Sequence, residues 1–244
     1  MPYPTFEQKL EKKIISRFQK AIYQYNLIQD GDNILIALSG GKDSLCMLEM
    51  LGRRMKIHNP YFKAEAVHIR MDNVNYQSDT SYLKSFADGY GIPLHVIATH
   101  FDFSENSGKP ICFLCSWYRR KQIFNLAQKL GCNKIALGHH MDDIIHTAMM
   151  NQFFQGQFST MPVKLQMKKI PLAIIRPLCL VSETDISQYA EMKGYEKQKK
   201  LCPFEKESHR TNMRDIFNTI EKINPEARYS MWNALEAAGK LIEL

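Results

Sequence analysis

Three short segments of the 244-residue chain concentrate side chains that can bind phosphate, hold a metal or transfer a proton. The first is the run SGGKDS at 39–44, and the second contains Cys112 and Cys115, spaced C-x₂-C. The third is the run GHHMDD at 138–143. A late thiol, Cys202, lies far from the other two cysteines in sequence. These residue types predict an enzyme that handles a nucleotide and carries a metal centre.

The run at 39–44 has the composition of a phosphate-binding loop. Its two glycines let the backbone turn tightly and bring N–H groups close to an anion, and the N-terminus of the following helix adds its positive dipole end. Lys42 contributes charge, while Asp43 is placed to organise Mg²⁺ or to cap the helix. This is not a Walker A loop, which requires Gly where this chain has Ile36 and Ser or Thr where it has Asp43. We predict that ATP is bound by the following residues: Ser39, Gly40, Gly41, Lys42, Asp43 and Ser44.

The C-x₂-C pair lets two thiolates bind one metal centre, and the nearby Arg119 and Arg120 favour the deprotonated thiols. Cys202 supplies a third ligand from a distant turn. Three cysteines suit a [4Fe–4S] cluster with one iron left open. A zinc site remains an alternative if His209 is a fourth ligand, and a redox pair is a further one. The remaining cysteines lack such spacing and have apolar neighbours, which predicts small buried hydrophobic residues: Cys46, Cys132 and Cys179.

The run GHHMDD follows an apolar segment and opens a predicted helix. This is the carboxyl end of a parallel strand, where ligands bind in doubly wound sheets. An alternative without catalysis is that Asp142 caps the helix and Asp143 favours its first turn. Adjacent helical residues point about 100° apart, so the two carboxylates cannot share one role. We favour Asp143, together with Asp43, as catalytic.

The elements that must position these groups follow from periodicity. Strands are predicted at 33–38, 64–69, 93–98, 134–137 and 173–175, and helices at 5–28, 45–55, 78–90, 116–130, 142–154, 183–193, 208–223 and 225–241. Strands that alternate with helices indicate an α/β fold with a doubly wound parallel sheet. We expect an N-terminal helix at 1–30, the main domain with the Fe–S site at 31–205, and a C-terminal helical appendage at 206–244.

The net charge of the chain is +7, from 32 Lys and Arg against 25 Asp and Glu. This excess favours a polyanionic partner such as RNA. The N-terminal helix bears several cations, which form either a solvated face or an RNA-contacting arm: Lys9, Lys12, Lys13, Arg17 and Lys20. The N-terminus does not read as a signal peptide, and no window matches a membrane span. We therefore expect a cytoplasmic protein with no membrane association.

The order of motifs SGGKDS, CFLCSWYRR, IALGHHMDDI and IIRPL, followed by a late cysteine, resembles the TtcA family of tRNA 2-thiocytidine synthetases. These enzymes belong to the PP-loop ATP pyrophosphatase superfamily, and the likeness runs from Asn33 to Cys202. The resemblance implies that Cys112, Cys115 and Cys202 ligate a [4Fe–4S] cluster. It also implies tRNA as the partner and a homodimeric assembly.

The reaction implied by this resemblance has two steps. ATP with Mg²⁺ adenylates the C2 carbonyl oxygen of a pyrimidine, most simply cytidine, and sulfur from a cysteine desulfurase or from sulfide then displaces AMP. Two other functions fit parts of the sequence: a PP-loop amidotransferase or lysidine-type ligase, and a zinc-stapled RNA-binding module. Thiolation of a different base or of a small molecule is a third alternative.

Overall fold

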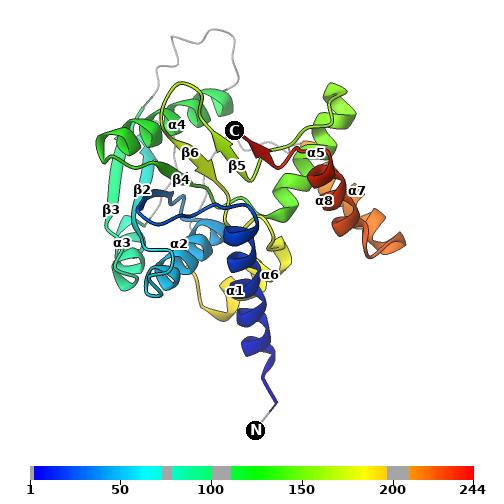
Figure 1. The fold of residues 1–244 in the computed structure, drawn as a ribbon, viewed down its shortest axis with the longest axis horizontal. Coiled ribbons are helices and arrows are strands. Elements are labelled where there is room, and N and C mark those ends of the chain that lie inside the picture. The colour runs from blue at the N-terminus through cyan, green and yellow to red at the C-terminus, as the bar shows by residue number, and fades with distance from the viewer. Residues whose placement is uncertain (1–2, 73–78, 101–110, 197–208) are drawn as a thin grey trace.

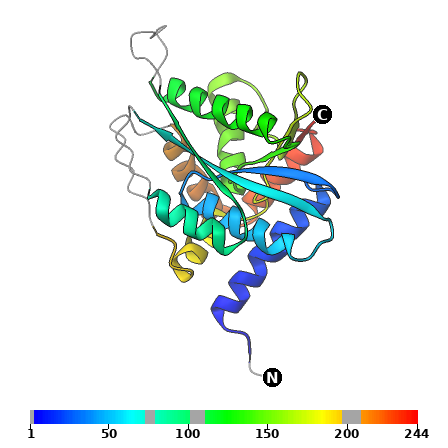
Figure 2. The same cartoon turned by 90° about the vertical axis from the view of Figure 1, so that its left-hand side faces the viewer.

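The computed structural model describes residues 3–72, 79–100, 111–196 and 209–244 (Figures 1 and 2). Its strands are β1 Asp32–Ala37, β2 Phe62–Met71, β3 Leu94–Thr99, β4 Lys134–Ala136, β5 Lys164–Gln166, β6 Ala173–Ile175 and β7 Ile242–Glu243. Its helices are α1 Phe6–Gln24, α2 Lys42–Met55, α3 Thr80–Gly89, α4 Ile111–Lys129, α5 Met141–Gln155, α6 Glu183–Met192, α7 His209–Ile223 and α8 Ala227–Ala237.

The strands form one sheet in the order β3-β2-β1-β4-β6-β5-β7. The five strands from β3 to β6 are mutually parallel, whereas β5 runs antiparallel to β6 and β7 runs parallel to β5. The chain moves outward in one direction from β1 to β3 and then crosses back to β4 on the other side of β1. This reversal confirms the predicted doubly wound α/β fold and creates a switch point between β1 and β4.

Alternation along the central strands supplies both faces of the sheet with apolar side chains. In β1, Ile34 and Ile36 belong to the larger hydrophobic cluster, whereas Leu35 belongs to the smaller one. Figure 2 shows α4 on one face of the sheet and α2 and α3 on the other. Burial on both faces explains why β1 reads as an almost continuous apolar run in the sequence.

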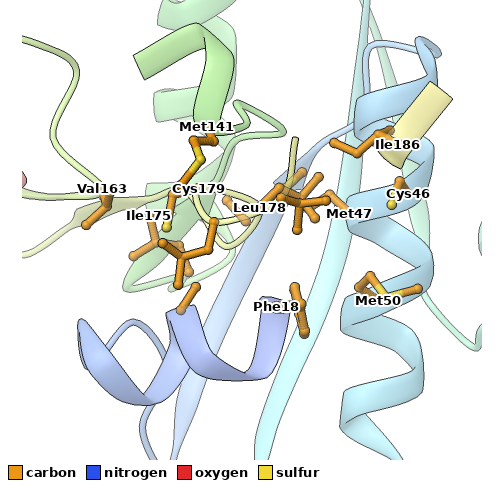
Figure 3. Close-up of a cluster of buried hydrophobic side chains, with 14 of the residues drawn as sticks. Phe18, Cys46, Met47, Met50, Met141, Val163, Ile175, Leu178, Cys179 and Ile186 are labelled. Carbon is orange, nitrogen blue, oxygen red and sulfur yellow. The ribbon is translucent and has the colours of Figure 1, made fainter. Parts of the chain in front are cut away.

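The three isolated cysteines are buried, as predicted. Cys46 and Cys179 lie in the larger cluster, and Figure 3 draws both among apolar side chains such as Met47 and Ile175. Cys132 lies in the smaller cluster. Burial raises the pKa of all three thiols above their ordinary values, to about 11 for Cys132. These side chains act as small apolar groups in the core.

Every predicted helix and strand is present, with ends that differ by a few residues. The helix α4 begins at Ile111, so the C-x₂-C pair lies within its first turns and not before it. The short strands β5 and β7 were not predicted. Phe6, in the first turn of α1, is 66% exposed. None of the helices in the described ranges is long and apolar enough to cross a membrane.

The terminal helices contribute to the same core as the sheet. Leu10 and Ile14 of α1 and Trp232 and Leu235 of α8 belong to the larger hydrophobic cluster. The strand β7 adds to the sheet beside β5. The boundaries of the predicted division at 1–30, 31–205 and 206–244 stay a prediction.

Candidate functional site

The loop SGGKDS joins β1 to α2 at the switch point and is held together by its own hydrogen bonds. The Ser44 hydroxyl accepts from the Gly40 N–H at 3.2 Å and from the Ser39 hydroxyl at 3.1 Å, and it donates to the Gly41 carbonyl at 2.9 Å. Gly40 has φ +85°, a conformation that favours glycine. Because Ser44 is only 3% exposed and its hydroxyl is engaged within the loop, it shapes the loop more than it reaches outward.

Gly138 allows the end of β4 to approach this loop closely. A Cβ atom at Gly138 would lie 3.1 Å from the Ser44 nitrogen and 3.2 Å from the Asp43 carbonyl oxygen, so a side chain there would press on the start of α2. Sequence reasoning gave Gly138 no role of its own. A glycine directly after a buried strand was the available signal, and the packing of two segments far apart in sequence gives it meaning.

The GHHMDD segment brings carboxylates to the same place. His140 is the N-cap of α5, with its imidazole 6% exposed, and its Nε2 lies 3.4 Å from Asp143 Oδ2 and 4.0 Å from Asp43 Oδ1. Asp143 also accepts a hydrogen bond from the His140 backbone N–H at 3.2 Å. The structure thus brings Asp43 and Asp143, the two predicted catalytic residues, to one histidine.

Burial works to lower the pKa of His140, but the carboxylates of Asp142, Asp143 and Asp43 outweigh it and raise the pKa above its ordinary value. The Nδ1 atom of His140 lies 3.5 Å from Asp142 Oδ2. That contact is electrostatic, since this nitrogen has no hydrogen-bond partner within the described part of the chain. A charged His140 would offset the repulsion between the surrounding carboxylates.

The Asp142 side chain points away from that of Asp143. The N-cap of α5 is His140 and not Asp142, which was the alternative considered from the sequence. Asp142 accepts a hydrogen bond from the Glu183 backbone N–H at 2.7 Å and forms an ion pair with Arg228 of α8. Burial acts to raise the pKa of Asp142, but the nearby His140 and the hydrogen bond from Arg228 outweigh it and hold the pKa well below its usual range. Asp142 therefore joins α5 to α6 and α8 as a structural clamp.

Two further contacts connect the site to neighbouring segments. Lys42 lies 3.0 Å from Asp43 and 3.4 Å from Glu183 at the start of α6. Partial burial works to lower the Lys42 pKa, but these two carboxylates raise it overall, so the side chain is a cation. Arg176, from the IIRPL segment, donates to His139 Nδ1 at 3.1 Å. The SGGKDS, GHHMDD and IIRPL segments, which are separate in sequence, are therefore in contact.

Two cavities border the loop. The larger, about 720 Å³, is lined by residues 40–43, by α6 and by residues 194–196, and its size lies in the range that holds small ligands. The smaller, about 70 Å³, is lined by Ser39, by His68 of β2 and by Arg119 of α4, with apolar neighbours. The second cavity places α4 directly beside the start of the phosphate loop.

Cys112 and Cys115 lie three residues apart on α4, hence on one side of the helix. Cys112 is exposed and Cys115 half-buried. Arg119 follows Cys115 by one turn, so the two thiols lie one to two turns beyond the small cavity. Cys202, the third predicted ligand, lies outside the described residues, as does the side chain of His209. The described residues hold no group of three His, Cys, Asp or Glu side chains suited to a metal ion.

Two of the five N-terminal cations make contacts within the protein. Lys13 forms a 2.7 Å ion pair with Asp185 of α6. Arg17 donates to the Leu180 carbonyl at 3.1 Å and to the Tyr229 hydroxyl at 2.8 Å. These two side chains fasten α1 to the body, whereas Lys9, Lys12 and Lys20 are exposed. The RNA-contacting arm on α1 stays a prediction.

A glycine-containing loop between a central parallel strand and a helix, at the switch point of a doubly wound sheet, is typical of nucleotide-binding α/β proteins. A family model described as the PP-loop domain matches residues 7–218. A tRNA-cytidine(32) 2-sulfurtransferase of Shewanella woodyi is 36% identical over 237 residues, covering 95% of this chain and 74% of the relative. A Francisella tularensis protein called tRNA-cytidine(32) 2-sulfurtransferase 1 is 35% identical, covering 93% of this chain and 86% of its own length. The chain belongs to this family of PP-loop sulfurtransferases, the TtcA family.

A solved structure shares the fold. The U34-tRNA thiolase NcsA from Methanococcus maripaludis, determined with its [4Fe–4S] cluster, superposes with a TM-score of 0.74. It is 23% identical in sequence, and the match covers 95% of this chain and 79% of that one. At this identity the likeness concerns the arrangement of helices and strands.

Proposed function

We propose that this protein transfers sulfur to C2 of a cytidine in tRNA and cleaves ATP to AMP and pyrophosphate in the process. Membership of the TtcA family supports the reaction and the substrate. The observation that carries the proposal is the convergence of the phosphate loop, the Asp43–His140–Asp143 group and the cysteine-bearing helix α4 at one edge of the sheet.

ATP binding is assigned to residues 39–44. The backbone N–H groups of the loop, the N-terminus of α2 and the cation of Lys42 all favour phosphate oxygens. Ser44 acts by shaping the loop, and Ser39 lies at the junction between the loop and the small cavity. Binding ATP here fixes the α-phosphorus for attack by the C2 carbonyl oxygen, and pyrophosphate leaves.

Mg²⁺ is assigned to Asp43 and Asp143. Carboxylate oxygens are ligands that Mg²⁺ accepts, and both side chains are partly exposed, at 31% and 17%. Both approach the same His140 nitrogen, so both oxygens lie on one side of the loop. The bound ion would neutralise charge on the phosphates while the C2 oxygen attacks.

The predicted three-cysteine cluster fits the two described thiols. Cys112 and Cys115 have ligand spacing on one helix face, and Arg119 and Arg120 supply positive charge near them. Together with Cys202 they would hold a [4Fe–4S] cluster, which would supply a sulfur nucleophile. In the second step a C2–S bond forms, the C2–O bond breaks and AMP leaves with the oxygen, so no electrons are gained or lost overall.

The proposal extends to the partners and location of the protein. The sulfur source is a cysteine desulfurase or free sulfide, the assembly is a homodimer and the compartment is the cytoplasm. None of these affects the geometry described above. A sizing column tests the homodimer, and a comparison of donors in the reconstituted reaction tests the sulfur source.

The test of the function is the reaction itself. Anaerobically purified protein is incubated with ATP, Mg²⁺, sulfide and unmodified tRNA, and the nucleosides are analysed by mass spectrometry. We expect 2-thiocytidine together with equal amounts of AMP and pyrophosphate. Release of ADP and phosphate contradicts the PP-loop chemistry, and a colourless anaerobic protein holding one zinc contradicts the cluster. A PP-loop ligase predicts activity that survives replacement of Cys112, Cys115 and Cys202 by Ala.

A further inference from the structure

The outward side of α4 presents aromatic and cationic residues where a soluble helix ordinarily presents only polar ones. Its inward residues, among them Leu114, Tyr118 and Ile123, pack against the smaller hydrophobic cluster. Five exposed residues follow one another at helical spacing on the outward side, and we name them the outer stripe: Phe113, Ser116, Trp117, Arg120 and Lys121. Phe113 is 44% and Trp117 43% exposed.

A single exposed aromatic residue is ordinary on a protein surface and carries no argument alone. Here two aromatic rings are followed by two cations along the stripe, and Lys121 Nζ lies 5.3 Å from the centre of the Trp117 ring. The Arg120 guanidinium donates to the Ser116 carbonyl at 3.2 Å, so it too lies along the stripe. The helix carries four cations and no Asp or Glu; the four are Arg119, Arg120, Lys121 and Lys129. This charge favours a polyanion.

The position of the stripe gives it a relation to the chemistry. It adjoins Cys112 on the same helix, and Trp117 lies about 7–8 Å further along the axis at 1.5 Å per residue. That distance is about two base-stacking steps of 3.4 Å. Proteins that grip unpaired nucleic acid combine a cationic surface with aromatic rings on which bases stack.

We propose that the outer stripe of α4 is a docking surface for unpaired nucleotides next to the modified base, with Trp117 stacking on one base and Arg120 and Lys121 holding phosphates. This rests on the proposed function and adds the place where the RNA strand lies. A base taken out of its stack leaves its neighbours exposed, and an aromatic ring beside the reaction site replaces part of the lost stacking. Trp117 is a positioning residue in this account.

The experiment compares Trp117→Ala and Trp117→Phe with a matched control, Phe153→Ala, which removes another exposed ring at the end of α5. All variants are prepared with the cluster and checked for iron content and melting temperature. We expect Trp117→Ala to weaken tRNA binding by about 5- to 100-fold, the range for stacking on one base. Trp117→Phe should retain most of the affinity, and Phe153→Ala should retain all of it. The KM for ATP should not change.

Fluorescence gives a second readout, since the chain contains two tryptophans and Trp232 is only 4% exposed. Titration with tRNA should quench wild-type emission, and Trp117→Phe should lose that quenching while Trp232 remains. Unchanged tRNA affinity in Trp117→Ala overturns the proposal, as does an equal loss in Phe153→Ala. A defect seen only with a protein sulfur donor, and not with sulfide, overturns it in favour of a protein-docking surface. Failure of the wild type to thiolate tRNA is a different result and contradicts the proposed function.

Discussion

The phosphate-loop region lies beside α4, but this region and the outer stripe of α4 are built in opposite ways. In the loop region the groups that shape the site are buried and bound to one another, as with Ser44 at 3% and His140 at 4% exposure, and the Lys42 and Asp43 side chains are about one-third exposed. On α4, Cys112, Phe113 and Trp117 face outward. A small charged ligand requires donors fixed in advance, whereas a folded RNA requires an accessible surface. The contrast fits the two proposed roles, in which the loop region activates the nucleotide and the outer stripe positions the RNA.

Removing a carboxylate from the loop region should have the largest effect. Asp43→Ala should lower the rate of tRNA thiolation by at least about a hundredfold, because a metal's charge stabilisation is worth several kcal/mol. The side chain is 31% exposed, so the melting temperature should change little. Single-turnover measurement of AMP and 2-thiocytidine checks this. Asp215→Ala, on the exposed side of α7, is the matched control, and a variant with wild-type rate contradicts the role of Asp43.

Two adjacent carboxylates sharpen the comparison within the loop region. Asp142→Asn should lower the free energy of unfolding by about 2 kcal/mol, because a charge-assisted hydrogen bond to Arg228 is lost while Arg228 keeps its ion pair with Glu221. Asp143→Asn should cost less than about 1 kcal/mol, while abolishing most activity. Denaturant unfolding of both variants measures the difference. Equal destabilisation would show that the two residues do not have the separate roles assigned to them.

The same pair predicts a pH dependence with a defined sign. The pKa of Asp142 is lower in the folded protein than in the unfolded chain, so its stabilising contribution is present above the unfolded value of about 3.9. That contribution is lost as the pH falls from about 4 through the folded pKa. The free energy of unfolding of the wild type should therefore exceed that of Asp142→Asn at neutral pH, and this difference should disappear in the acidic range. A constant difference down to pH 2 contradicts the ion pair.

Thiol labelling compares the exposed α4 cysteine with a core cysteine. In protein stripped of its cluster, iodoacetamide at pH 8 should label Cys112 rapidly and Cys132 slowly. Burial raises the Cys132 pKa to about 11. At pH 8 only about one in a thousand such thiols is ionised. The labelling rate of Cys132 should increase with pH up to about 11, and peptide mass spectrometry follows it. Rapid labelling of Cys132 at pH 8 would show that the core opens readily.

The smallest effect concerns the exposed lysines of α1. Replacing Lys9, Lys12 and Lys20 by Ala should weaken tRNA binding modestly and flatten its dependence on salt by up to about three in log–log slope, about one for each phosphate contact. Filter binding at several KCl concentrations measures the slope. The control is Lys13→Ala, whose ion pair with Asp185 is internal, and which should leave the slope unchanged. An unchanged slope in the triple variant means that this side of α1 is only solvated.

Much of the fold could be predicted because its determinants are local. The buried strand, the Gly-Gly turn and the amphipathic helices depend on periodicity and backbone freedom over a few residues, and the structure contains each of them. The strands β5 and β7, of three and two residues, could not be predicted, since pairing with β6 and β5 creates them.

The sequence by itself determined the class of chemistry at this site, because a phosphate loop and a pair of thiol ligands each consist of residues that are close together in the chain. It also determined that Asp142 and Asp143 could not share a role. Only the tertiary structure decided which of them faces Asp43, since that depends on how α6 and α8 pack against α5. It likewise decided that Lys13 and Arg17 bind the protein's own segments. A sequence shows which residues are charged. The partners of Lys13 and Arg17 lie more than a hundred residues away, and the packing of the helices determines which partners they contact.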